Sequence, residues 1–459
     1  MNTIKLLQVV TDLSFVGGDH VYVRKLMRYL TTAHPGRFEI HVAEVRDHGT
    51  GEDLGAYDEL LALGVQVHSI KRDATRYLGF DLPRFLADVI SENGIDIVHS
   101  HIFAADLAVA ACRAGSRRFL EDLELEPAAA DLAVLDLIIK SGITDLAEIY
   151  LDALPGRGPA NPGFLPATPS FQWISTKHLG ALKSICQEQD LERLFGGDRP
   201  LWDKGHDLNS FLQRFVSRQS DVVVTISAMA NALWTGTARD VRYIPVACIG
   251  DLEWAAIENA RQLAAPRRAV GTRYAFVGRL ARKKNPLLLI EAFKEHLETF
   301  PDDELVVVGD GRLLRACKEA AEGTQRISFK GHVPPAEVIG LLAEVDAICL
   351  FSSEEGLPLV VQESMASSVP VLASRAGGIP DLVRHRESGF LVDEVSAEAI
   401  VETLAEFSGL DLMARQEMAR AARRSIEAWI SEEEAFESYV LAYHDLLRGR
   451  DVPDARTGF

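Results

Sequence analysis

The chain has 459 residues, enough for two or three domains with sizeable hydrophobic cores, which excludes a small disulfide-stapled or fibrous protein. Hydrophobic residues make up 47% and charged residues 25%, so a collagen-like or disordered chain is excluded as well. The formal net charge is −19, from 48 Lys and Arg against 67 Asp and Glu. This charge repels a phosphate backbone and argues against nucleic acid as a partner, although a few cations in a pocket can still bind one phosphorylated ligand.

The cysteines and the apolar segments point to the cytoplasm. The five cysteines are odd in number and form no CxxC pair, which predicts reduced thiols. The first ten residues do not have the pattern of a signal peptide, and no stretch approaches 18 consecutive apolar residues. We therefore expect a cytoplasmic protein without a transmembrane segment.

Short apolar, β-branched runs alternate with amphipathic segments twice along the chain, a pattern typical of parallel sheets flanked by helices. The first half has predicted strands at 4–10, 38–45, 65–70, 95–99, 172–176 and 222–226. The second half has them at 274–277, 305–308, 327–329, 347–350, 369–373 and 390–392. The predicted fold class is α/β, with two Rossmann-like, doubly wound parallel-sheet domains.

The alternation also gives the expected domain boundaries. We expect an N-terminal domain over 1–247 and a C-terminal domain over 248–430, joined by a linker near 244–251 that carries a Pro and a Gly. Residues 431–459 are expected to form a helix and a tail that pack back on the N-terminal domain.

One stretch, at about 117–170, breaks the pattern and is interpreted as an insertion in the first domain. It ends in residues 155–169, which contain five Pro and three Gly and can form neither a helix nor a central strand. Such a loop could shape a binding site or an interface. An inert surface elaboration explains the pattern equally well.

Two carboxylates, Glu355 and Glu363, stand eight residues apart around the predicted start of a helix. Pro358 suits the first turn of that helix, so the backbone N–H groups of residues 356–359 would be free to bind a phosphate. At a helical rise of about 1.5 Å per residue, the carboxylates are at most about 12 Å apart, the scale of one nucleotide sugar. A cap and a solvated helix face are the plainer explanation of the same two residues.

A cationic loop precedes this segment. Residues 278–285 (Gly-Arg-Leu-Ala-Arg-Lys-Lys-Asn) follow a predicted strand and precede a helix that begins at Pro286. A phosphate-bearing ligand at the carboxyl ends of a parallel sheet needs such cations, because a diphosphate departs only when its charge is neutralised. Arg279 and Lys284 are the candidates, with a merely solvated charge run as the alternative.

Taken together, these motifs resemble the glycosyltransferase family 4 members that have the GT-B fold. The resemblance covers most of the chain, except residues 115–170. The motifs occur in matching order: Gly17-Gly18, 96–101, the loop 278–284, 308–311, 331–333, the Glu-x7-Glu signature of Glu355 and Glu363, and 377–380.

The resemblance implies roles for the donor side. Arg279 and Lys284 would hold a donor diphosphate, Glu363 would accept hydrogen bonds from the ribose, and Glu355 would lie beside the sugar and its anomeric carbon. Val333 would contact the base through its backbone. The site segment would also include Gly356, Leu357 and Leu359.

On the other domain, the resemblance implies that Gly18 lets the backbone approach the donor without a Cβ and that His101 reaches in beside the acceptor. His101 is otherwise a structural hydrogen-bonding residue after a strand. The pair His99 and His101 alternatively suggests a metal, but it lacks the third protein ligand of a catalytic zinc site. We expect no metal and no cofactor.

The sequence also departs from the family pattern at several positions. Residues 245–248 read Pro-Val-Ala-Cys where the family commonly has Pro-Asn-Gly, Asp381 replaces a Glu, and Ser368 stands where Gly is common. The first departure bears on interdomain geometry and acceptor placement.

The expected function is therefore transfer of a sugar with retention, without metal, from a nucleoside-diphosphate sugar, with UDP-hexose expected, to an acceptor hydroxyl or amine. The acceptor would be a small molecule or a glycan. A non-catalytic nucleotide-sugar-binding scaffold of the same fold is the alternative. A nicotinamide-dependent oxidoreductase would need a GxGxxG motif, which Gly17-Gly18 and the glycines at 309 and 311 do not complete.

Overall fold

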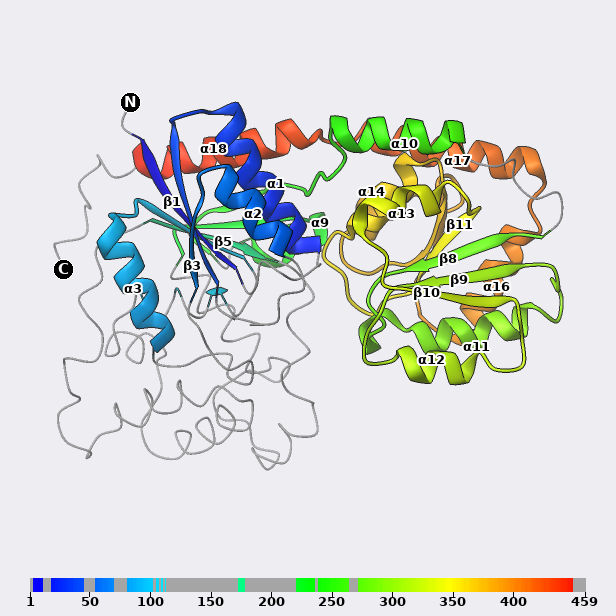
Figure 1. The fold of residues 1–459 in the computed structure, drawn as a ribbon. Coiled ribbons are helices and arrows are strands. Elements are labelled where there is room, and N and C mark those ends of the chain that lie inside the picture. The colour runs from blue at the N-terminus through cyan, green and yellow to red at the C-terminus, as the bar shows by residue number, and fades with distance from the viewer. Residues whose placement is uncertain are drawn as a thin grey trace, which may run out of the picture. The chain divides into compact units, whose positions relative to one another are not determined.

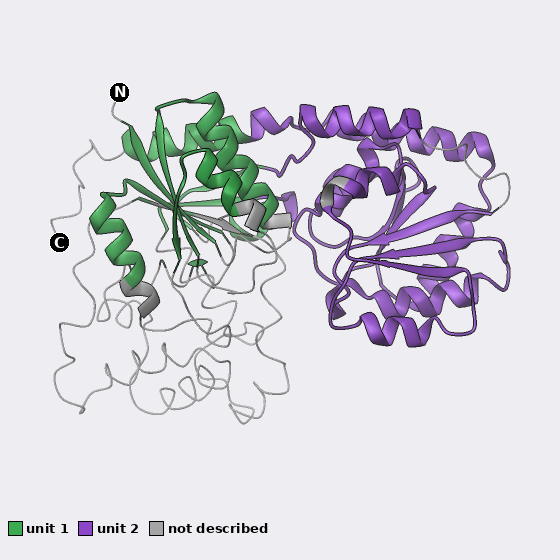
Figure 2. Ribbon diagram, in the orientation of Figure 1, with its two compact units in different colours: residues 1–225, 231–244, 436–459 green, residues 226–230, 245–435 purple. Residues whose placement is uncertain are grey.

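The computed structural model describes residues 3–10, 18–44, 54–69, 81–101, 105–106, 109, 112, 172–177, 220–235, 238–263 and 271–448. The predicted insertion at about 117–170 lies outside the described residues. The chain divides into two compact units, one of 1–225, 231–244 and 436–459, the other of 226–230 and 245–435 (Figure 2). Each unit contains its own sheet (Figure 1).

The seven strands that the structure describes in the first unit are all parallel, in the order β3-β2-β1-β4-β5-β6-β7. Their bounds are β1 Ile4–Val10, β2 Phe38–Glu44, β3 Gln66–Ser69, β4 Ile97–His101, β5 Gln172–Lys177, β6 Val222–Thr225 and β7 Val241–Tyr243. The six strands predicted from hydrophobic patterning are present, with ends shifted by at most two residues. Strand β7 was missed because it is a three-residue edge strand whose side chains are only partly buried.

The helices of the first unit bury one apolar stripe each. Helix α1 (Gly18–Ala33) buries residues 23, 26, 27 and 30, the spacing of one helix face. The other helices here are α2 (Leu54–Ala62) and α3 (Asp81–Asn93), and α9 (Ala228–Trp234) begins in the second unit and ends in the first. The last helix, α18 (Glu432–Arg448), packs on α1 from Phe436 onward, and the ring centroids of Tyr22 and Phe436 are 5.2 Å apart.

The second unit repeats the same topology with six parallel strands, in the order β10-β9-β8-β11-β12-β13. Their bounds are β8 Arg273–Val277, β9 Glu304–Val308, β10 Ile327–Gly331, β11 Ala347–Leu350, β12 Val371–Ser374 and β13 Gly389–Val392. Apart from the edge strand β10, whose side chains alternate between buried or half-buried and exposed positions, the strands are buried on both faces, which explains why they are nearly continuous apolar runs.

Helices cover both faces of this second sheet. They are α10 Asp251–Leu263, the 3₁₀ turn η2 Arg282–Lys284, α11 Pro286–His296, α12 Leu314–Ala320, α13 Pro335–Leu342, α14 Leu359–Ala366, α15 Ile379–Leu382, α16 Ala397–Ser408 and α17 Leu412–Glu427. The aromatic core between the sheet and α11 and α16 contains Tyr274, Phe276, Phe293 and Phe407.

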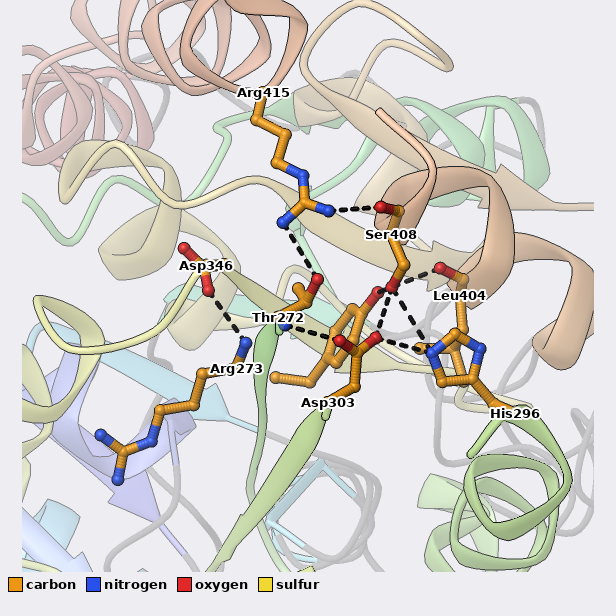
Figure 3. A network of polar contacts seen from close by, with 9 residues as sticks. Thr272, Arg273, His296, Asp303, Asp346, Leu404, Ser408 and Arg415 are labelled. Carbon is orange, nitrogen blue, oxygen red and sulfur yellow. Dashed lines mark hydrogen bonds and ion pairs between the residues drawn. The ribbon is translucent and has the colours of Figure 1, made fainter. Parts of the chain in front are cut away.

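A buried polar network closes the amino end of this sheet (Figure 3). The Asp303 carboxylate accepts three hydrogen bonds, from the Thr272 N–H at 2.6 Å, His296 Nε2 at 2.8 Å and Ser408 Oγ at 2.6 Å. Arg415 of α17 adds a hydrogen bond from Nη1 to Thr272 Oγ1 at 3.0 Å. Burial alone raises the pKa of Asp303, but the hydrogen bonds outweigh burial and hold its pKa below the ordinary value. The network thus joins the sheet to α11, α16 and α17.

We expect Asp303→Ala to lower the free energy of unfolding of the second unit by about 3 kcal/mol, because it leaves three buried donors without their acceptor. The neighbouring variant Asp302→Ala is the matched control. Asp302 is exposed and pairs with Arg326 at 3.0 Å, so its loss costs less than about 1 kcal/mol. Urea denaturation of both variants tests the difference, and equal losses would contradict a structural role for the network.

Candidate functional site

The strand order places the candidate site at the carboxyl ends of β8 and β11. These two strands are neighbours, but the chain leaves them toward β9 on one side and β12 on the other. Loops diverge at such a topological switch point and leave a crevice in which ligands of open α/β sheets bind. The loops that follow β8 and β11 contain the two motifs on which the sequence analysis depended.

The structure brings Lys284 and Glu355 together at this point. The Lys284 Nζ forms an ion pair with Glu355 Oε1, and the two side chains are only 15% and 7% exposed. Lys284 ends η2, whereas Glu355 lies in the loop after β11. An ion pair this sheltered from water is screened little by salt, so it fixes the two loops relative to each other.

Two further contacts hold the same loops. Asn285 adopts a left-handed conformation with φ 48°, and its Nδ2 donates to the carbonyl of Phe351 at 2.8 Å. The Ser353 N–H donates to the carbonyl of Lys283 at 2.8 Å. The turn that carries Lys284 is therefore anchored to the loop that carries Glu355 by backbone as well as by charge.

Glycines allow the loops at this end of the sheet to touch through their backbones. Gly309 has φ 131°, and a Cβ there would lie 2.0 Å from the carbonyl oxygen of Gly278. At Gly377, with φ 57°, a Cβ would lie 1.9 Å from the carbonyl oxygen of Glu355. Only glycine fits at such contacts, which is the physical reason for these motif glycines.

Helix α14 begins directly after the Glu355 loop. Pro358 is its N-cap residue, with φ −67° and ψ 126°, so the expectation that Pro358 lies in the first helical turn is wrong by one residue. The correction follows from the extended backbone of Pro358, which leaves Leu359 as the first helical residue. The N-cap residue Pro358 makes no side-chain cap, and the Val361 N–H donates to the Pro358 carbonyl at 3.2 Å, so the N–H groups of Leu359 and Val360 are the ones that could meet an anion in the described part of the chain.

The other predicted donor-side residues are distributed around this end of the sheet. Glu363 is the fifth residue of α14 and is half-buried, whereas Leu357 is buried. A Cβ at Gly378 would lie 2.4 Å from Leu357 Cδ1, so this leucine packs inward and offers a ligand only its backbone. Gly356 accepts a hydrogen bond from the Gly378 N–H at 2.6 Å. Leu359 is half-buried.

Arg279 and Val333 lie on either side of β9. Arg279 is exposed in the loop after β8, and Val333 is half-buried in the loop after β10. Strands β8 and β10 are separated by β9 alone, which puts their ends about 10 Å apart at the usual strand spacing. The loops after β8, β10 and β11 together therefore span the length of one nucleotide.

His101 and Gly18 belong to the first unit. Gly18 is the first residue of α1, and His101 ends β4 as a buried residue. The His101 Nε2 donates to Gln8 Oε1 of β1 at 2.6 Å, which ties the end of β4 to the neighbouring strand.

A second histidine of β4 completes a buried polar chain. His99 Nδ1 accepts from the Tyr443 hydroxyl at 2.8 Å, and the rings of His99 and His101 have centroids 4.0 Å apart. Gln8 Nε2 donates to the same hydroxyl at 3.4 Å. The sequence analysis missed Gln8 and Tyr443, although a glutamine inside an apolar strand is a signal that could have identified the former.

Burial lowers the pKa of His99 to about 3, against about 6.5 in the unfolded chain. Below pH 6.5 the unfolded chain therefore binds one more proton, and folding stability is lost as the pH falls toward 3. We expect a loss of about 1.4 kcal/mol per pH unit from this residue between pH 6 and 4.

His99→Asn should remove that part of the slope, because its amide oxygen can accept from Tyr443 without titrating. Urea denaturation at pH 7, 6 and 5, with hydrogen exchange of β4 as the readout, measures the slope. An unchanged slope in the variant would show that His99 is protonated in the folded protein.

Two departures from the family pattern have a structural basis. Ser368 has φ 59°, a left-handed conformation that explains why glycine is common at this position. Asp381 Oδ2 accepts from the Ala228 N–H at 2.8 Å at the start of α9. A carboxylate here thus has a structural partner.

Comparison with known proteins identifies the segment that contains the site. Residues 270–425 match the family described as Glycosyl transferases group 1. This segment belongs to the glycosyl transferases group 1 family. It includes Arg279, Lys284, Glu355 and Glu363, so the site at the switch point lies wholly within the part of the chain that the family covers.

Curated relatives match parts of the chain. A D-inositol 3-phosphate glycosyltransferase of Corynebacterium glutamicum (strain R) is 35% identical over 140 residues, 28% of this chain and 34% of that protein. The putative colanic acid biosynthesis glycosyltransferase WcaL of Escherichia coli K12 is 32% identical over 160 residues, 33% of this chain and 39% of that protein. The matches thus span about a third of the length of these relatives.

Solved structures resemble the whole chain. Sucrose-phosphate synthase of Thermosynechococcus elongatus has a TM-score of 0.66 at 16% identity and covers 97% of this chain and 100% of its own. HepE of Anabaena, in complex with UDP-glucose, has a TM-score of 0.59 at 14% identity and covers 96% and 100%. This likeness confirms the predicted class of two Rossmann-like parallel-sheet domains of the GT-B type. No helix in the described part of the chain is long and apolar enough to cross a membrane.

Proposed function

We propose that this protein is a retaining, metal-independent glycosyltransferase that moves a hexose from a UDP-sugar to an acceptor hydroxyl or amine. The observation that supports the proposal most directly is the Lys284–Glu355 ion pair at the switch point, next to the uncapped N-terminus of α14. A cation, a carboxylate and the amide groups at a helix N-terminus at one place suit a ligand with a diphosphate at one end and a sugar at the other.

The donor would lie across three loops. Its diphosphate would meet Lys284, Arg279 and the first-turn amides of α14, its ribose hydroxyls would donate to Glu363, and its base would meet the backbone of Val333. The strand spacing supports this placement, because the base and the diphosphate of one nucleotide are separated by about the width of two strand gaps.

The ion pair sets the electrostatics of the donor site. Without a donor, Glu355 neutralises Lys284. An arriving diphosphate would compete for the ammonium group, so the lysine would lie between two anions. Glu355 would then stabilise the positive charge that develops at the anomeric carbon and would orient the sugar hydroxyls.

The reaction itself breaks the bond between the anomeric carbon and the diphosphate oxygen and forms a bond from that carbon to the acceptor oxygen or nitrogen. Transfer on one face retains the configuration, and the departing phosphate oxygen takes the acceptor proton. His101, whose Nε2 donates to Gln8 Oε1, would contribute a polar contact on the acceptor side, while the acceptor proton goes to the departing phosphate oxygen.

Calorimetry with UDP-glucose, UDP-N-acetylglucosamine and GDP-mannose tests donor binding, with Glu363→Ala as the variant that should lose it. Mass spectrometry of products with pooled acceptors, with and without EDTA, then tests transfer and metal dependence. Donor binding without any transfer or hydrolysis would favour the non-catalytic scaffold. If no donor binds the wild-type protein, the proposal fails.

A further inference from the structure

Helix α14 is joined by hydrogen bonds to the segment that leads from β7 to α10. Gln362, the residue before Glu363, is 1% exposed. Its Oε1 accepts from the Cys248 N–H at 3.1 Å, and its Nε2 donates to the Val246 carbonyl at 3.0 Å. The side-chain amide of Gln362 thus donates to one backbone carbonyl and accepts from a backbone N–H two residues further along the same segment.

This backbone is buried. Val246, Ala247 and Cys248 are at most 3% exposed. The same Val246 carbonyl accepts a second hydrogen bond, from Trp429 Nε1 at 3.1 Å, in the segment that precedes α18. The apolar sequence that replaces Pro-Asn-Gly here is therefore a packed segment, and both polar groups that Gln362 contacts are shielded from water.

Helix α14 needs such an anchor. It has eight residues and no side-chain cap at its N-terminus, and a helix this short does not hold its conformation without tertiary contacts. Val361 and Met365 of this helix are buried, but apolar contacts tolerate small shifts of the helix along its axis. The two hydrogen bonds of Gln362 do not tolerate such shifts, because each bond depends on distance and angle.

We propose that Gln362 is a positioning residue for donor binding. Its two hydrogen bonds fix the position of α14 relative to residues 246–248, and this position places Glu363 at the nucleotide ribose. The inference rests on the proposed function, because it assigns to Gln362 an effect exerted through the donor contact of Glu363.

The test compares Gln362→Leu with Trp429→Phe, which removes the other hydrogen bond to the same Val246 carbonyl and leaves the sequence of α14 unchanged. UDP and GDP are the calorimetric probes, and the one that wild-type protein binds more tightly is used throughout. Gln362→Leu should raise the Kd for this nucleotide about tenfold, which corresponds to the loss of one well-made hydrogen bond. Trp429→Phe should raise it less than twofold. Equal effects of the two variants would overturn the inference in favour of general destabilisation.

A double-variant cycle shows whether Gln362 acts through Glu363. If it does, Gln362→Leu should weaken binding little further in a Glu363→Ala background, because the contact that it positions is already gone. Full additivity of the two effects would overturn the inference. If Glu363→Ala weakens binding and Gln362→Leu does not, the inference alone fails. If wild-type protein binds neither UDP nor GDP, the proposed function fails first.

Gln362→Glu provides a signature that loss of packing cannot imitate. Burial at this 1% exposed position raises the pKa of the introduced carboxyl group above its ordinary value of about 4.3, so the group becomes protonated at mildly acidic pH. The protonated group donates and accepts like the amide, whereas a carboxylate facing the Val246 carbonyl can only repel it. The Kd of this variant relative to wild type should be raised about tenfold at pH 8 and approach one at pH 5.5. A ratio that does not change with pH would contradict the directional role of the amide.

Discussion

Replacing Lys284 by glutamine is expected to lower the rate of sugar transfer by about a hundredfold, the usual effect of removing one preorganised donor to a leaving group. Lys284 is partly sheltered and lies at the switch point, where an ammonium group acts on a diphosphate with little screening by water. The matched control is Lys283→Gln, which removes an exposed cation from the same 3₁₀ turn. It should change turnover less than about threefold, because an exposed charge is screened. Steady-state rates of donor turnover for both variants measure the difference.

The same substitution leaves Glu355 buried without its counter-ion, so it should also destabilise the second unit by about 3 kcal/mol. Lys284→Gln combined with Glu355→Gln removes both charges and should recover most of that stability without recovering turnover. This pair of variants separates catalysis from folding. If turnover returned together with stability, Lys284 would serve only to neutralise Glu355.

Gly377→Ala is expected to have the largest effect on stability, a loss of more than about 4 kcal/mol in the second unit. Its Cβ would lie 1.9 Å from the Glu355 carbonyl oxygen and 2.6 Å from the Glu355 carbonyl carbon. Both atoms are backbone, so no side chain can move aside, and the loop that carries Glu355 would have to shift. Donor binding should be lost with the loop.

The matched control is Gly323→Ala. Gly323 also has positive φ, 91°, but a Cβ there would meet no atom within 4 Å. This variant should cost about 1 kcal/mol, the strain of a non-glycine residue in that conformation, and should leave donor affinity unchanged. Thermal and urea denaturation compare the stability of the two variants. Similar losses of stability would mean that position 377 requires glycine because of its positive φ and not because of the contact with Glu355.

Hydrophobic patterning alone determined the fold class of this protein. Parallel strands buried on both faces must be continuous apolar runs, and the helices between them must be amphipathic, so the sequence predicts the strands of both sheets within two residues at their ends. Strand β7 was not predicted, because a short edge strand buries too little surface to require an apolar sequence pattern. Lys284, Glu355 and Glu363 are also candidates that the sequence predicts, because their motifs have the residue types that a diphosphate and a sugar would require.

Tertiary structure alone decided how those residues are held. Lys284 and Glu355 are 71 positions apart in the sequence, a separation that does not require them to meet, and only the neighbouring positions of β8 and β11 make them an ion pair. The same holds for Gln362. The sequence pattern does not indicate which groups this buried glutamine contacts, and only the structure shows that they are the backbone groups of Val246 and Cys248. Local patterns record which surface of an element is buried, whereas hydrogen bonds and ion pairs between distant segments depend on which elements the topology makes neighbours.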